Sequence, residues 1–228
     1  MVFSSVIFIF TFLPIVLFLY YIIPSKKWKN LILFLASLVF YAWGEPVYIF
    51  LMLFSTICTY ILGLDIANCK KNGQQKKARN SMIYAVVLQI MILGFFKYMD
   101  FLIGTVNDLF GGSISLLNIA LPIGISFYTF QTMSYIIDVY RGKVPPQRDF
   151  IAFAAYVTLF PQLIAGPIVR YVDVAAQIDA RELDSENIFR GVTRFCIGLG
   201  KKVLLADHIG QVADQLLGGS FAGATSVG

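Results

Sequence analysis

Two apolar stretches, at residues 121–142 and 150–171, most constrain what this chain can fold into. Each is long enough for a helix to cross the ~30 Å hydrocarbon core of a bilayer. Each also carries residues that a plain lipid-facing anchor would avoid. These are Gln131 and Asp138 in the first stretch and Pro161, Gln162, Gly166 and Pro167 in the second. A carboxylate at the centre of a spanning helix costs roughly 2.5–3.5 kcal/mol on insertion scales and needs a partner or a water-filled cavity. We therefore predict that these six residues line a channel or site within the membrane.

The second stretch is not expected to form one regular helix. Proline removes a backbone hydrogen bond and clashes with the preceding turn, so a broken or re-entrant segment is predicted near residues 160–167. Gln131 and Gln162 lie near the middle of their stretches. They can hydrogen-bond each other and hold two helices together, or they can contact a substrate.

Asp138 and Arg141 are three residues apart and can project from the same helix face. One interpretation is an ion pair at the membrane boundary. The other is a cytoplasmic gate, where an anionic donor meets Arg141, Lys143 or Arg170, because a guanidinium suits the geometry of phosphate.

The rest of the chain has the same character, since 58% of its 228 residues are hydrophobic and only 14% are charged. Soluble proteins carry about 25% charged residues. Further apolar runs, some of them short for a full crossing, are found at 2–23, 31–43, 47–64 and 81–96, the last extending towards 103. We predict an all-α, polytopic transmembrane bundle, with polar loops at 65–80 and 107–118. Residues 189–205 are amphipathic and cationic, and are expected to lie in the membrane interface or to cross beside a partner.

The distribution of basic residues predicts an orientation. Eleven of the 18 Lys and Arg residues lie at 24–30, 65–80 and 140–149, whereas the alternate connections at 44–46 and 104–120 have none. The positive-inside rule places the three basic segments in the cytoplasm and the N-terminus outside a cell membrane that the chain crosses several times. Because the basic residues form no single patch, the net charge of +5 does not indicate nucleic-acid binding.

The motifs carry a family resemblance. The segments LPIGISFYTFQTMSYIIDVYRG and LFPQLIAGPIVRY, together with LILFLASLVFYAWGEP, GFFKYMDF and GLGKKVLLAD in the same order, resemble the alginate O-acetyltransferase branch of the membrane-bound O-acyltransferases. The resemblance implies acetyl transfer from a cytoplasmic donor, acetyl-CoA, to an extracellular or cell-wall polysaccharide such as alginate. It also implies an extracytoplasmic partner acetyltransferase and no bound cofactor or metal.

The resemblance also implies that residues 1–228 are the N-terminal part of a longer acyltransferase domain, whose essential histidine lies beyond Gly228. This chain alone is then expected to be inactive. His208, the one histidine present, lies outside the central pair of stretches. The sequence contains no phosphate-binding glycine loop, G-x-S-x-G elbow or metal-ligand cluster. The alternative is a non-enzymatic transporter or flippase for a lipid-linked sugar, although no internal repeat of the kind common in transporters is found.

Overall fold

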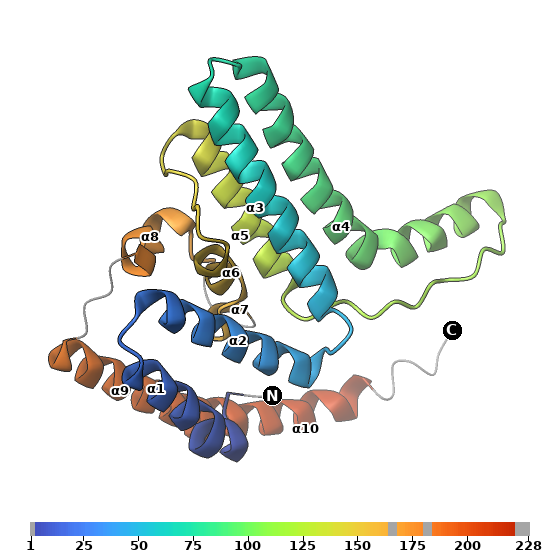
Figure 1. Ribbon diagram of the computed structural model, residues 1–228. Helices are drawn as coiled ribbons and strands as arrows, with labels where there is room; N and C mark the ends of the chain where they lie inside the picture. Colours follow the sequence, from blue (N-terminus) through green and yellow to red (C-terminus); the bar gives the residue numbers. More distant parts are fainter. Residues whose placement is uncertain (1–2, 164–167, 180–183, 222–228) are drawn as a thin grey trace. The chain divides into compact units, whose positions relative to one another are not determined.

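The computed structural model describes residues 3–163, 168–179 and 184–221, and within these ranges the chain is helical, with no strand (Figure 1). The predicted all-α class is confirmed to that extent. The chain divides into two compact units, one of residues 16–181 and one of residues 2–15 with 182–228.

The first unit holds the two stretches that the sequence singles out. Its helices are α1 (Leu13–Ile22, shared with the second unit), α2 (Lys26–Gly44), α3 (Ile49–Lys71), α4 (Gln75–Phe110), α5 (Ile125–Arg141), α6 (Phe150–Thr158), α7 (Phe160–Leu163) and α8 (Tyr171–Asp179). The helices α3, α4 and α5 pack against one another, as Figure 1 shows. The helix α2 packs against α6 and α7, and α8 packs against α5 and α6.

The second unit contains two helices joined by a π-helical segment. Its elements are η1 (Phe8–Phe12), α9 (Ser185–Gly200), η2 (Lys201–Ala206) and α10 (Asp207–Phe221). The carboxylate of Asp184 caps α9 by accepting a hydrogen bond from the Glu186 N–H. The predicted amphipathic segment at 189–205 therefore falls on α9 and η2, and α9 buries none of its residues.

The first unit buries several polar side chains within its apolar core and exposes many large apolar ones. Gln89 of α4 is buried, accepts a hydrogen bond from the Ser55 hydroxyl of α3 and donates one to the Thr59 hydroxyl. On the surface of these helices, the side chain of Phe50 is 73% exposed and that of Met91 is 67% exposed. This is the pattern of a protein whose solvent is lipid, in which polar groups must find partners within the bundle.

By length and composition, α3 and α4 are the described helices that can cross a membrane. Both helices extend into the region 65–80 that is predicted to be a loop. In that region Gly73 has a left-handed backbone conformation, and it lies in the turn between the helices. The predicted loop at 65–80 is therefore wrong: α3 continues to Lys71, α4 begins at Gln75, and the turn is limited to residues 72–74. The Ser81 hydroxyl donates to the Asp65 carboxylate and ties the two helices together beside this turn.

The predicted loop at 107–118 also begins too early. The helix α4 continues to Phe110 and ends where Gly111 takes a left-handed conformation, at φ +64°. The Gly111 N–H donates to the Asn107 carbonyl, and the Asn107 side chain bonds both backbone groups of Ile114. Glycine adopts this conformation without a steric penalty, so it ends the helix here.

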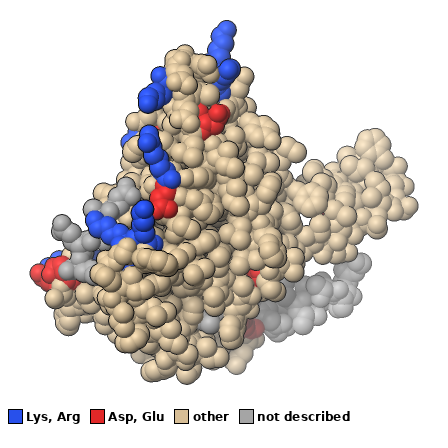
Figure 2. All heavy atoms as spheres, in the orientation of Figure 1, with Lys and Arg blue, Asp and Glu red and all other residues tan. Residues whose placement is uncertain are grey.

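Pairwise contacts connect the three basic segments of the first unit. The Lys70 ammonium donates to the Tyr140 carbonyl at 2.6 Å, which joins the end of α3 to the end of α5. Lys27 and Arg148 line the same surface pocket, so the start of α2 lies beside the α5–α6 loop. In Figure 2, Lys and Arg gather at the tip where α3 ends and α4 begins, and wide areas of the face carry no charge.

Candidate functional site

A polar and aromatic stripe on α5 is the centre of the candidate site. Tyr128, Gln131, Tyr135 and Asp138 follow one another at intervals of three or four residues, so they lie on one helix face. All four are buried. The contacts of Gln131, Tyr135 and Asp138 are made with residues 147–171, which include the second apolar stretch.

That second stretch breaks as the sequence predicts. The helix α6 begins at a cap, where the Asp149 carboxylate accepts from the Ile151 and Ala152 N–H groups, and ends at Thr158. Leu159 leaves the helical region with φ −52° and ψ 112°. The N–H of Phe160 donates to the Ser37 hydroxyl of α2 instead of a carbonyl one turn back. The break therefore leaves the Tyr156 carbonyl without its helical partner, since helical bonds join residue i to i−4.

Both glutamines bond this freed carbonyl. The side-chain amide of Gln131 donates to the Tyr156 oxygen at 3.1 Å, and that of Gln162 donates to the same oxygen at 2.6 Å. The predicted direct bond between the two amides is therefore wrong, although their predicted proximity is correct. A carbonyl oxygen has two lone pairs and can accept both bonds.

Asp138 forms the main ion pair of the site. Its side chain is 1% exposed, and one guanidinium nitrogen of Arg170 lies 2.6 Å from each carboxylate oxygen. The predicted pair of Asp138 with Arg141 is wrong, because Arg141 is exposed at the last position of α5 and Arg170 takes the carboxylate.

The three cations predicted at a donor entrance all lie around Asp138, and we call these four residues the Asp138 cluster: Asp138, Arg141, Lys143 and Arg170. Arg141 follows Asp138 by three residues on α5. The Lys143 N–H donates to the Asp138 carbonyl at 2.9 Å, and its side chain is exposed. Arg170 is 44% exposed beyond the ion pair. The cluster thus presents cations to solvent above one buried carboxylate.

Four residues that the sequence did not single out surround the cluster: Tyr135, Gln147, Tyr156 and Tyr171. The Gln147 N–H donates to the Tyr135 hydroxyl, and the Gln147 amide donates to the Tyr171 hydroxyl. The Tyr171 ring meets those of Tyr135 and Tyr156 edge to face. The density of tyrosine in both stretches is the one sequence signal that points to these contacts.

Two buried side-chain hydroxyl groups of α5 add to this polar face. The Tyr128 hydroxyl and the Thr129 hydroxyl are buried, and neither has a hydrogen-bond partner among the described residues. Such groups cost roughly 1–3 kcal/mol each unless a water or ligand meets them. They add to the polar lining that the stripe provides.

The remaining predicted residues are placed as follows. Pro161 is exposed in the short helix α7, and Gly166 and Pro167 lie outside the described residues. His208 is exposed on α10. Within the described parts of the chain, no three His, Cys, Asp or Glu side chains come together to hold a metal ion.

Comparison with known proteins identifies relatives along nearly the whole chain. It is 43% identical over 219 residues to a probable alginate O-acetylase of Pseudomonas aeruginosa, covering 94% of this chain and 42% of the relative. It is 42% identical to the probable alginate O-acetylase of Azotobacter vinelandii, covering 94% of this chain and 43% of the relative. The peptidoglycan O-acetyltransferase of Helicobacter pylori is 32% identical, covering 94% of this chain and 46% of the relative.

The chain thus spans less than half the length of these relatives. No protein-family model and no solved structure matches it. The resemblance seen in the motifs is nevertheless confirmed: this chain is a relative of the alginate O-acetylases.

Proposed function

We propose that this protein is a membrane O-acetyltransferase that acts in the O-acetylation of an extracellular or cell-wall polysaccharide. The observation that carries the proposal is the identity of 42–43% to probable alginate O-acetylases over 94% of the chain. The similarity to a peptidoglycan O-acetyltransferase leaves the acceptor polymer open between alginate and other wall polymers.

The Asp138 cluster is our proposed entrance for the acyl donor, acetyl-CoA. The exposed cations of Arg141, Lys143 and Arg170 offer donors to phosphate oxygens, and Arg170 has N–H groups beyond those that bond Asp138. Asp138 fixes the position of Arg170, because its carboxylate is buried and bonds the guanidinium through both oxygens.

The polar stripe of α5 is our proposed path from that entrance. In acetyl transfer the thioester C–S bond breaks, a C–O bond to the acceptor forms, and the hydroxyl proton passes to a base and then to the leaving thiolate. Water must be excluded, because it competes as the acceptor. Gln131 holds the broken segment against α5, and Gln162 bonds the same carbonyl from within that segment. These contacts would keep the path closed to water.

In the proposed topology the protein crosses the cell membrane several times, with its N-terminus outside. The excess of Lys and Arg in the three basic segments, which pairwise contacts connect, supports a cytoplasmic position for the donor entrance. The acceptor is extracellular, so we further propose that an extracytoplasmic partner acetyltransferase completes the transfer to the polymer.

Complementation tests this function. In cells that keep the partner proteins of an alginate O-acetylase, this chain would replace the matching part of that acetylase, because the chain alone is expected to be inactive. The acetyl content of the secreted polymer would then be measured. We expect acetylation to be restored, and the Arg141→Gln substitution to raise the KM for acetyl-CoA several-fold in isolated membranes. Arg79→Gln, an exposed arginine on α4 outside the Asp138 cluster, is the matched control. No acetylation by a stably inserted protein would contradict the proposed function.

A further inference from the structure

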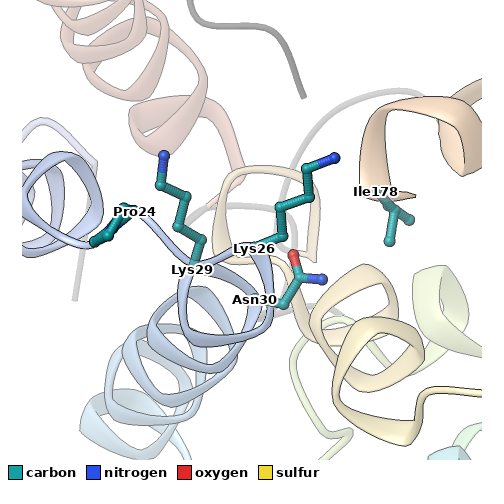
Figure 3. Close-up of a pocket in the computed structure, with 5 residues that line it drawn as sticks. All are labelled: Pro24, Lys26, Lys29, Asn30 and Ile178. Atoms are coloured by element: carbon teal, nitrogen blue, oxygen red, sulfur yellow. The ribbon is translucent and has the colours of Figure 1, made fainter. Parts of the chain in front are cut away.

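A small pocket at the start of α2 lies apart from the Asp138 cluster. It is lined by Pro24, Lys26, Lys29, Asn30 and Ile178, and has a volume of about 80 Å³ (Figure 3). Pockets that hold whole drug-sized ligands measure roughly 300–1,000 Å³. This pocket can therefore admit one small chemical group and not an entire nucleotide.

The end of α2 at this pocket is strongly electropositive. Its cap residue, Ser25, makes no side-chain hydrogen bond to the helix, and the first turn contains no acidic residue. The first N–H of α2 with a backbone acceptor among the described residues is that of Lys29, which donates to Ser25. The free N–H groups and the helix dipole add to the positive charges of Lys26 and Lys29. The first turn of a helix usually carries an acidic residue, and α2 has none there.

A second, independent feature of the pocket is the buried amide of Asn30. This side chain is only 5% exposed and lines the pocket. Among the described residues, no hydrogen-bond partner is found for the amide. The amide is therefore free to donate a hydrogen bond to an acceptor bound in the pocket. In Figure 3 the amide lies on the same side of α2 as the Lys26 side chain, and Lys26 extends towards Ile178.

We infer that this pocket binds a phosphate group. The tetrahedral anion offers several acceptor oxygens, which match two ammonium groups, the NH2 of Asn30 and the N–H groups that open α2. Ile178 of α8 closes one side of the pocket and limits it to a small group. A helix end alone would be weak support, but the unpartnered Asn30 amide points independently to a hydrogen-bond acceptor.

The phosphate can come from a membrane lipid or from a soluble anion, and the surroundings favour a lipid headgroup. Trp28, on the same turn of α2, is 59% exposed, and the Lys29 ammonium lies 5.1 Å from the ring centroid of Tyr20. Exposed aromatic rings beside lysines are typical of the membrane–water interface. Clusters of Lys and Arg at the cytoplasmic membrane surface attract anionic lipid headgroups. This inference does not rest on the proposed acetyl transfer.

The test is a binding titration of the full chain, purified in detergent. Phosphatidylglycerol is titrated by native mass spectrometry, with diacylglycerol as the lipid that lacks phosphate, and inorganic phosphate is titrated separately as the soluble anion. We expect phosphatidylglycerol to bind and diacylglycerol not to bind. Lys26→Gln, Lys29→Gln and Asn30→Leu are each expected to weaken phosphatidylglycerol binding about fivefold.

Lys27→Gln is the matched control, since it removes the same charge from the same helical turn but does not line this pocket. We expect it to change binding less than twofold. If inorganic phosphate binds with the same dependence on the three variants and displaces the lipid, the phosphate site stands and its ligand is soluble. The inference is overturned if Lys27→Gln weakens binding as much as the pocket variants do, or if Asn30→Leu leaves binding unchanged. Because Lys26 and Lys29 lie at the helix start, their variants test the site even if Asn30→Leu alters the fold.

Discussion

Arg170 neutralises Asp138 across 32 residues of sequence, with 2.6 Å between one guanidinium nitrogen and each carboxylate oxygen. The carboxylate is buried on α5, whereas the guanidinium comes from the segment before α8. The pair explains how the Asp138 carboxylate can be buried in an apolar helix. Arg170, from another segment, provides hydrogen bonds and charge in place of the water that the carboxylate loses on burial. It also ties the end of α5 to the region beyond the helix break.

The first prediction concerns the stability of this ion pair. Arg170→Met leaves Asp138 buried and unpaired, and breaking a fully buried pair costs about 3–5 kcal/mol. Because Arg170 is 44% exposed, we expect a smaller loss than for a fully buried pair, measured as a lower free energy of unfolding in detergent. The double variant Asp138→Leu with Arg170→Met should recover part of that loss, since no charge is left buried.

The corresponding control is Arg190→Met, which removes an exposed arginine whose pair with Glu186 lies on the surface of α9. Surface pairs contribute about 0–1 kcal/mol, so this variant should unfold nearly as the parent does. A double variant less stable than Arg170→Met alone would show that the pair does not carry a buried-charge penalty.

The second prediction concerns the shared acceptor at Tyr156. Gln162→Leu and Gln131→Leu each remove one hydrogen bond to the carbonyl that the helix break frees. We expect each to reduce acetyl transfer several-fold at equal membrane abundance. Gln131→Leu removes a bond between α5 and the broken segment, and Gln162→Leu removes a bond that fixes the shape of that segment. Acetyl content of the polymer, normalised to the amount of protein in membranes, is the measurement.

The control for these variants is Gln177→Leu, an exposed glutamine on α8. Gln89 is unsuitable as a control, even though its helix is otherwise plain, because it joins α3 to α4 through Ser55 and Thr59. Equal losses for Gln177→Leu and the two site variants would mean that the shared acceptor has no particular role in transfer.

The third prediction concerns orientation. In a chain whose three native cysteines are replaced by serine, Gly112→Cys should react with a membrane-impermeant maleimide in intact cells. Asn72→Cys, in the turn between α3 and α4, should react only after permeabilisation. The physical reason is that the basic ends of α3, α4 and α5 are retained in the cytoplasm. The reverse labelling pattern would contradict the proposed topology.

The fourth prediction concerns the close approach of α3 and α5. A Cβ atom at Gly63 would lie 2.9 Å from a ring carbon of Tyr135, and the Tyr135 hydroxyl accepts a hydrogen bond from Gln147. The ring therefore cannot move without losing that bond, and Gly63→Ala should lower the free energy of unfolding by about 1–3 kcal/mol.

Gly94→Ala provides the comparison, because a Cβ atom at this position of α4 meets nothing within 4 Å. Alanine also favours helix by about 1 kcal/mol over glycine. We expect the thermal unfolding midpoint to fall for Gly63→Ala and to stay equal or rise for Gly94→Ala. Equal midpoints would show that Tyr135 yields to a methyl group at Gly63.

The sequence by itself determined the helical class, the break in the second stretch and the relationship to the O-acetylases. Apolar run length predicts where helices form, and Pro161 predicts a break because it removes a backbone hydrogen bond and clashes with the preceding turn. Gln131, Asp138 and Gln162 could be predicted as candidate site residues from the sequence, because polar groups within apolar runs need partners. Helix ends were less predictable, because polar residues such as Lys70 and Gln75 continue a helix into water as readily as they form a loop.

The tertiary structure alone decided the partners. Spacing on one helix favoured Arg141 for Asp138, but Arg170 reaches the carboxylate from a different segment. Spacing also placed Gln131 and Gln162 together, yet both bond the Tyr156 carbonyl that the break leaves free. Hydrogen bonds and ion pairs are satisfied by whichever group packing brings within about 3 Å. Sequence periodicity fixes the face on which a side chain lies, and only the packing of α5 against the broken segment fixes what it meets there.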